Sequence, residues 1–174
     1  MGTEQPRKLV GYCGLYCGNC GIYKGRIVAR VAADLQELVA AHGFAEWVPR
    51  FEKTDFSFGE FEKGLAYFCD EQRGPYCQHP CKEGGGPPCK IRPCAQGKDL
   101  EMCFGCDEFP CELLSRFLER HPEIIEEKEA FERLGMERWL GLKADEAKRG
   151  YVYATGKCYT GAKNERNSTR HAAG

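Results

Sequence analysis

Cysteine is the residue type whose number and spacing in this sequence most clearly indicate chemistry. The chain has 12 cysteines among 174 residues, and all but Cys69 and Cys158 lie in short clusters separated by two to four residues. Thiolates at this spacing can turn toward one point, which is typical of metal sites. We predict that the metal ligands are Cys13, Cys17, Cys20, Cys77, Cys81, Cys89, Cys94, Cys103, Cys106 and Cys111.

Other residues near the thiols support tight turns or offer a further ligand. Gly14, Gly18, Gly21 and Gly105 stand beside cysteines, and we expect them to supply turns with positive φ. His79 lies between Cys77 and Cys81. Its imidazole can replace a thiol as ligand, although we favour an exposed loop histidine at this position.

Zinc is the metal that we favour. Closed four-thiolate zinc sites are structural, and the clustered thiols suffice for about two zinc ions with two thiols left over. The sequence does not assign ligands to sites. We therefore expect a zinc-stabilised binding or adaptor module, with an unidentified protein as its partner, and we lean against an enzyme because the chain has only 4 histidines and no identifiable base beside a nucleophile.

Two alternatives stay open. The spacing of Cys13, Cys17 and Cys20 also suits a [4Fe-4S] cluster, as in radical S-adenosylmethionine enzymes, although the chain is short for their barrel. An iron-sulfur protein for electron transfer or redox chemistry is thus the first alternative. A thiol-disulfide redox protein is the second, since Cys17 and Cys103 each open a Cys-x-x-Cys motif, but neither motif follows a strand of a strand-helix-strand unit.

Hydrophobic periodicity indicates the elements that position these cysteines. We predict helices near residues 22–42, 58–70, 110–120, 122–134 and 136–148. Residues 11–21 and 69–111 show no such period and form an irregular cysteine-rich lobe. The fold class is therefore an α-rich small domain, residues 1–155, stabilised by metal, followed by a mobile polar tail at 156–174.

Charge and hydropathy limit the other functions. Lysine plus arginine is 25 and aspartate plus glutamate is 26, so nucleic acid is an unlikely partner. We expect the four basic residues of the cysteine-rich region to offset thiolate charge instead, namely Lys82, Lys90, Arg92 and Lys98. No apolar stretch suits a membrane span or a signal peptide, which predicts a soluble, cytoplasmic protein. Glu126, Glu127 and Glu129 are expected on a solvated helix face.

Two motifs resemble a known family. YCGLYCGNC near the N-terminus and CKIRPCAQGKDLEMCFGCDEFPCELL after it are similar to the cysteine-rich family called domain of unknown function 3795. The resemblance runs from about Gly11 to Phe117, implies that the clustered cysteines bind metal, with zinc favoured, and supplies no activity. Relatives often have a cysteine where this chain has Gly86, so His79 or Cys69 is a candidate to complete one site. Only Cys158 remains in the tail, which predicts no terminal metal site.

Overall fold

The computed structural model describes residues 5–51 and 55–159, and within these residues it is rich in helix, as predicted. The α-helices are α1 (Val28–Ala41), α2 (Phe44–Phe51), α3 (Phe58–Cys69), α4 (Ile91–Gly97), α5 (Glu112–Leu118), α6 (Glu123–Leu134) and α7 (Met136–Lys148). Short 3-10 turns are η1 (Pro6–Leu9), η2 (Cys17–Asn19), η3 (Cys81–Glu83) and η4 (Cys103–Gly105). Strands β1 (Tyr151–Val152) and β2 (Lys157–Cys158) pair antiparallel, with Tyr151 opposite Cys158.

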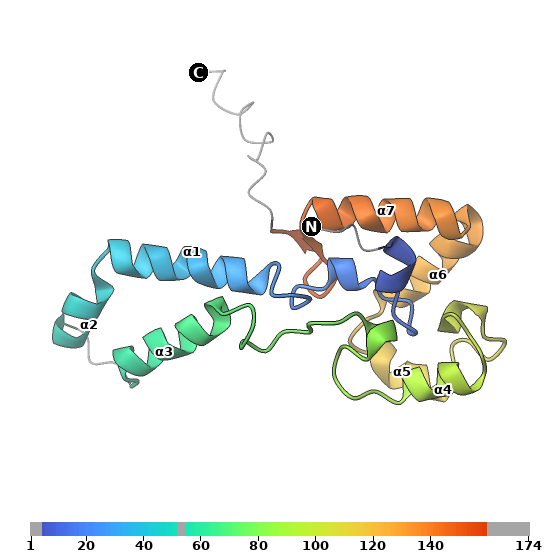
Figure 1. Ribbon diagram of the computed structural model, residues 1–174, viewed down its shortest axis with the longest axis horizontal. Coiled ribbons are helices and arrows are strands. Elements are labelled where there is room, and N and C mark those ends of the chain that lie inside the picture. The colour runs from blue at the N-terminus through green and yellow to red at the C-terminus, as the bar shows by residue number, and fades with distance from the viewer. Residues whose placement is uncertain (1–4, 52–54, 160–174) are drawn as a thin grey trace, which may run out of the picture.

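Helices α1, α2 and α3 form a helical arm that extends to one side of the molecule (Figure 1). Helix α1 packs along α3. The buried residues of α1 are small or β-branched, Ala29, Ala32 and Val39, whereas those of α3 are the larger Phe58 and Leu65. This pairing of small with large side chains lets the two helices approach closely, but it buries little apolar surface.

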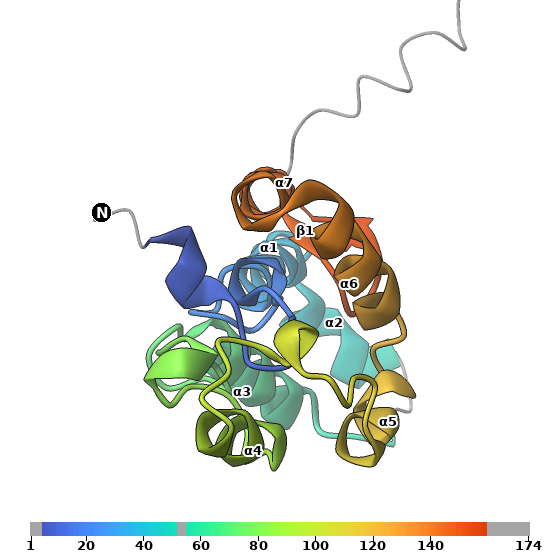
Figure 2. The same cartoon turned by 90° about the vertical axis from the view of Figure 1, so that its right-hand side faces the viewer.

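The main hydrophobic core lies at the other end of the molecule, beneath α6 and α7. Trp139 and Ile124 are fully buried there, and Val10, Tyr16, Met102 and Phe104 pack into the same cluster. Those four residues come from the segments that carry the first and last cysteine clusters. Figure 2 shows α6 and α7 on one side of the molecule, α4 and α5 on the other, and the N-terminal segment between them. The core therefore fixes the backbone segments that carry the first and last cysteine clusters.

Several elements differ from the sequence-based expectations. Helix α1 begins at Val28 rather than near residue 22, because Lys24 and Gly25 have φ of 52° and 67° and Tyr23 forms a parallel bridge with Cys77. Helices α2 and α4 were not predicted, and α4 lies inside the region expected to be irregular. In the predicted tail, Lys157 and Cys158 form β2, while residues 160–174 lie outside the described part of the chain.

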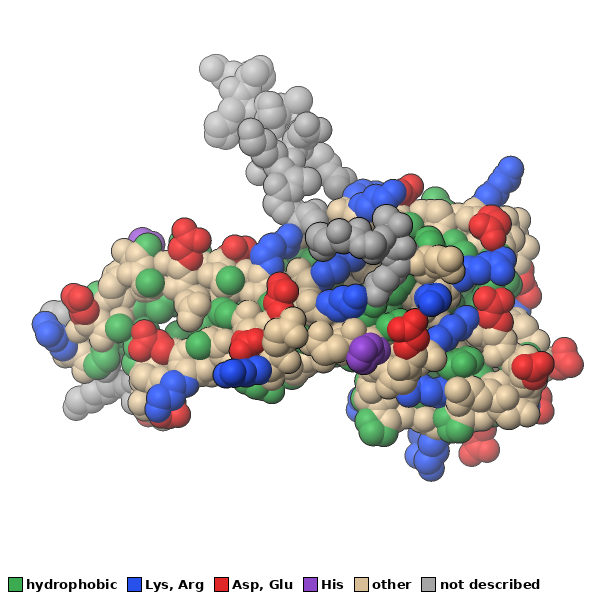
Figure 3. Space-filling model, viewed as in Figure 1, with side chains coloured by type: hydrophobic (Ala, Val, Ile, Leu, Met, Phe, Trp, Pro, Cys, Tyr) green, Lys and Arg blue, Asp and Glu red, His purple; other side chains and the backbone are tan. Residues whose placement is uncertain are grey.

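The surface has no extended region of one charge on the face shown in Figure 3, where basic and acidic side chains alternate. Among the described residues, no helix has both the length and the apolar character that a membrane crossing requires.

Candidate metal centre

Three of the 3-10 turns begin at a cysteine, namely Cys17, Cys81 and Cys103. In two of them the turn closes on a second cysteine: the N–H of Cys20 donates to the carbonyl of Cys17 at 3.0 Å, and that of Cys106 donates to the carbonyl of Cys103 at 3.0 Å. A Cys-x-x-Cys turn of this form holds its two thiols on one side of the backbone, which suits shared coordination.

The clustered cysteines separate into two groups. The first cysteine group contains Cys13, Cys17, Cys20, Cys77 and Cys81, which all line one cavity and would repel one another as thiolates. The second cysteine group contains Cys89, Cys94, Cys103, Cys106 and Cys111, in which the other four thiols raise the pKa of Cys103. Cys103 of the second group also raises the pKa of Cys13, so Cys13 lies where the two groups meet. The structure thus brings all ten predicted ligands into two neighbouring places.

Backbone hydrogen bonds join the distant segments. The N–H of Cys77 donates to the carbonyl of Ile22 at 3.2 Å, and the N–H of Lys24 donates to the carbonyl of Cys77 at 2.9 Å. The N–H of Cys103 donates to the carbonyl of Tyr12 at 2.7 Å. The N-terminal cysteine segment is therefore held against both later cysteine segments without any help from the thiols.

Donors surround the sulfur atoms. Backbone N–H groups of Leu15, Cys81 and Gly86 hydrogen-bond the sulfurs of Cys13, Cys17 and Cys77, respectively. Each group also has one cationic side chain near a thiol: Arg92 Nη2 lies 3.9 Å from Cys81 Sγ, and Lys98 Nζ lies 3.9 Å from Cys106 Sγ. Donors and positive charge favour the thiolate form that a metal requires.

Burial opposes ionisation of these thiols. It raises the pKa of Cys13 to about 12, with a further increase from Cys81 and other nearby cysteines, and it raises the pKa of Cys17 and Cys103 to about 11. The pKa of Cys77 is raised for the same reason. Buried thiols resist ionisation, and thiolates that lie close together repel one another. Several of these thiols can therefore be ionised at the same time only if a cation binds between them.

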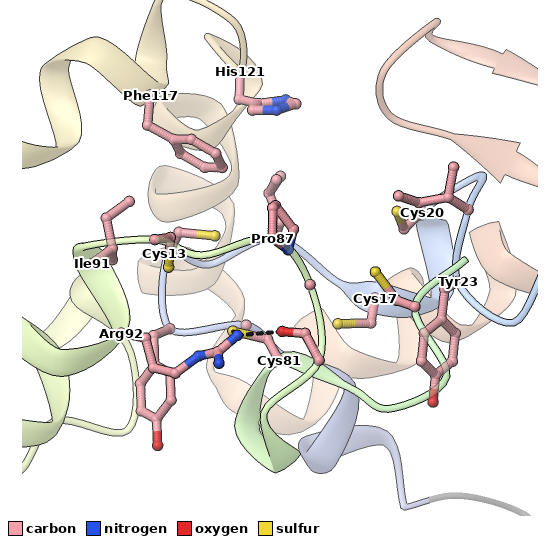
Figure 4. A pocket seen from close by; sticks show the side chains of 18 of the residues that line it. Cys13, Cys17, Cys20, Tyr23, Cys81, Pro87, Ile91, Arg92, Phe117 and His121 are labelled. Carbon is pink, nitrogen blue, oxygen red and sulfur yellow. Dashed lines mark hydrogen bonds between the residues drawn. The ribbon is translucent and has the colours of Figure 1, made fainter. Parts of the chain in front are cut away.

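A cavity of about 250 Å³ adjoins the first cysteine group. All five of its thiols line this cavity, together with Cys89, His79 and the aromatic side chains of Phe117 and Tyr153. In Figure 4, Cys17, Cys20 and Tyr23 lie at one end of the cavity and Cys13, Ile91 and Arg92 lie at the other. The second group adjoins a cavity of only about 20 Å³, lined by Cys94, Cys103, Cys106 and Cys111.

The donor set fits a thiophilic metal. Thiolates suit zinc and iron-sulfur clusters, and both groups offer at least four of them. In residues 5–51 and 55–159, no three cysteine, histidine, aspartate or glutamate side chains are close enough to share one ion as they stand. Coordination would therefore require the thiols of each group to turn toward one another.

The remaining candidates lie outside the two groups or at their edge. Cys69 ends α3 and acts on the phenol of Tyr76, and Cys158 is exposed on β2. His79 is exposed but lines the larger cavity. Gly86, where the family resemblance leads one to expect a cysteine, lines that cavity too, so a thiol at this position would join the first group.

Only one of the four glycines beside cysteines has the predicted role. Only Gly14 of the four has positive φ, 93°, and a Cβ there would lie 2.4 Å from the ring of Phe104. Gly18 is required for packing, because a Cβ would lie 2.4 Å from the ring of Tyr16. The prediction of positive φ was therefore wrong for three of them: Gly18 and Gly105 lie in 3-10 turns, and Gly21 lies in a turn without positive φ.

A buried ionic network, which the sequence did not reveal, supports the first group. Lys143 is buried and pairs with Glu127 and, at 2.8 Å, with Glu146. Glu146 accepts a hydrogen bond from Asn19 Nδ2 at 2.7 Å, and Glu127 accepts one from Trp139 Nε1 at 2.8 Å. Because Asn19 stands between Cys17 and Cys20, the network attaches their turn to α7. Glu127 was wrongly expected on a solvated face, since only tertiary packing brings it to Lys143.

One protein family matches this chain. The model of the family described as "Protein of unknown function (DUF3795)" matches residues 9–116. The match covers more than half of the chain and includes both cysteine groups, and the chain belongs to this family, as the motifs predicted. A search among curated proteins found no match, and a search among solved structures found none either.

Proposed function

We propose that this chain is a metal-binding protein in which zinc, held by two thiolate centres, stabilises a protein-binding or adaptor module. The observation that carries the proposal is the convergence of ten cysteines from four short segments into two groups. Each group has at least four thiols, backbone N–H donors or a cation beside a sulfur, and a cavity between its members. Four thiolates are the complete ligand set of a structural zinc site.

The small extent of the apolar core supports a structural role for the metal. Between α3 and α4, residues 70–90 contain only one buried side chain, Pro80, and no regular element longer than η3. Such a segment loses conformational entropy on folding without burying enough apolar surface to offset that loss. Coordination bonds at Cys77 and Cys81 would supply the missing stabilisation.

The helical arm supports the binding part of the proposal. Val31, Leu35 and Leu38 recur on one face of α1 and are 42%, 44% and 57% exposed. Trp47 and Phe68 on the neighbouring helices are exposed as well. Apolar side chains that gather on one element suit contact with another protein. Leu35→Glu should leave the zinc content and thermal unfolding unchanged if this face has no part in folding, and a loss of either would contradict that assignment.

An iron-sulfur cluster at the first cysteine group is the second candidate, and the size of the adjoining cavity, about 250 Å³, favours it. Elemental analysis and an ultraviolet-visible spectrum of protein purified without oxygen distinguish the two candidates. We expect colourless protein with about two zinc ions per chain. Brown protein that contains iron and acid-labile sulfide would favour the iron-sulfur cluster over zinc. Protein that neither contains nor takes up metal would refute the proposal.

A further inference from the structure

The two cysteine groups differ in how far they are enclosed. The cavity at the second group is about 20 Å³ and is lined by four cysteines and by apolar or aliphatic side chains such as Ile91, Ala95 and Leu114. The cavity at the first group is more than ten times larger, about 250 Å³. A closed thiolate site retains its ion, whereas a site with free space beside it admits an incoming ligand.

Each group has five cysteines, one more than a single zinc ion needs, but all five line one cavity in the first group and only four do so in the second. Within the first group, Cys17, Cys20, Cys77 and Cys81 come as two short-spaced pairs, and the charges of the other three act on Cys17. Four thiolates complete the tetrahedral shell of zinc. Cys13 is the fifth thiol of this group, and the close-up view places it at the opposite end of the cavity from Cys17 and Cys20 (Figure 4).

Cys13 nevertheless lies close to Cys81, one of the four paired thiols. A Cβ built on Gly11 would lie 3.6 Å from Cys13 Sγ and 3.5 Å from Cys81 Cβ, so both approach the same point. The hydrogen bond from Gly11 N–H to the Leu15 carbonyl, 2.7 Å, fixes the loop that carries Cys13. At the same end of the cavity, the buried Nε of Arg92 has no hydrogen-bond partner among the described residues. This N–H is therefore available to donate a hydrogen bond to an incoming ligand.

We infer that the first cysteine group is an exchangeable zinc site in which Cys13 acts as the incoming fifth thiol, while the second group is a permanent structural site. The inference rests on the proposed function. When Cys13 binds the ion, its thiol releases a proton to solvent, and the thiolate that it displaces takes up a proton. Neither the metal nor sulfur changes oxidation state. The cavity gives a chelator or a partner's thiol access to the ion during this exchange.

Zinc release from the full chain tests the inference. Zinc-loaded protein is mixed, without oxygen, with excess chromogenic chelator, and absorbance reports the released ion. We expect two phases of equal amplitude. The double variant Cys17→Ser/Cys77→Ser, which leaves three thiols in the first group, should remove the fast phase, and Cys103→Ser/Cys106→Ser should remove the slow one. Cys13→Ser should keep the zinc content of the wild type and lose the fast rate, so that both ions leave slowly.

Cys158→Ser is the matched control, because Cys158 is exposed and outside both groups, and it should change neither phase. A single phase in the wild type overturns the inference without any variant. Loss of an ion in Cys13→Ser also overturns it, because Cys13 would then be a permanent ligand, and so does iron with sulfide in the first group. Protein that binds no zinc would instead refute the proposed function itself.

Discussion

Replacing Lys143 by methionine should destabilise the protein strongly, because it leaves two carboxylates without their cation. The side chain of Lys143 is only 8% exposed, and its partners Glu127 and Glu146 are 22% and 23% exposed. Burial lowers the pKa of Lys143, but its hydrogen bonds to the two carboxylates outweigh this and leave the pKa raised. Removing one partner of a buried ion pair costs about 3–5 kcal/mol, and some residual solvent at the carboxylates reduces our expectation to about 2–4 kcal/mol.

The assay is urea unfolding of metal-loaded protein, followed by circular dichroism at neutral pH. Lys148→Met is the matched control on the same helix, because the side chain of Lys148 is 76% exposed and pairs with the exposed Asp145. It should give no measurable change. A loss below about 1 kcal/mol for Lys143→Met would refute the reasoning, since it would mean that the carboxylates are solvated or protonated at little cost.

The other predictions concern the thiols and one glycine. Cys17→Ser and Cys106→Ser should each hold one zinc ion more weakly and unfold at lower temperature, as checked by elemental analysis after dialysis against a chelator and by calorimetry; unchanged metal retention and stability in either would contradict the ligand assignment. Gly14→Ala should lower the free energy of unfolding by about 2–4 kcal/mol, because of its positive φ and the overlap of the new Cβ with the ring of Phe104. Gly141→Ala in α7 is the control, since a Cβ there meets nothing within 4 Å, and it should raise that free energy by about 0.5–1 kcal/mol. Equal effects of the two substitutions in urea denaturation would exclude the overlap. Metal-free protein should lose stability as the pH rises above 9.0, the ordinary pKa of a thiol. Above that pH the thiols of the unfolded chain lose their protons, whereas buried Cys13 in the folded protein keeps its proton, so unfolding becomes more favourable. A urea denaturation midpoint that does not fall at alkaline pH would contradict this.

Periodicity predicted the helices that have a wide apolar face and a clear end. Helices α6 and α7 lie within a residue of the predicted ranges. Helix α7 buries side chains at three- and four-residue steps, and α6 packs its buried Ile124 and the partly buried Phe131 and Leu134 against the core. Each helix is followed by a glycine with positive φ, Gly135 or Gly150. Helix α4 escaped prediction because it has only seven residues and buries only Ile91 and Ala95. A pattern this short is not distinguishable from a loop.

Cysteine spacing predicted the candidate ligands, whereas their division into groups came from the structure. Spacing alone makes Cys13 a natural partner of Cys17 and Cys20, yet backbone pairing of Tyr12 with Cys103 brings it toward the second group. Likewise, nothing local connects Asn19 with Glu146, 127 positions later. Both relations depend on long-range packing around Trp139 and Phe104, which a local pattern does not contain.

The order of the ligands along the chain gives the first cysteine group a mechanical role. Cys17 and Cys20 precede the helical arm, and Cys77 and Cys81 follow it, so one ion bound by both pairs would close a loop that contains all of α1, α2 and α3. By analogy with a disulfide, closing a loop of roughly 60 residues removes about 4 kcal/mol of conformational freedom from the unfolded chain. The backbone joins the same two segments through the short bridge between Tyr23 and Cys77. Zinc bound at the first group would therefore attach the helical arm more firmly to the core around Trp139. Because the arm has the exposed apolar face, an exchangeable ion there would make the position of that binding surface depend on the supply of zinc.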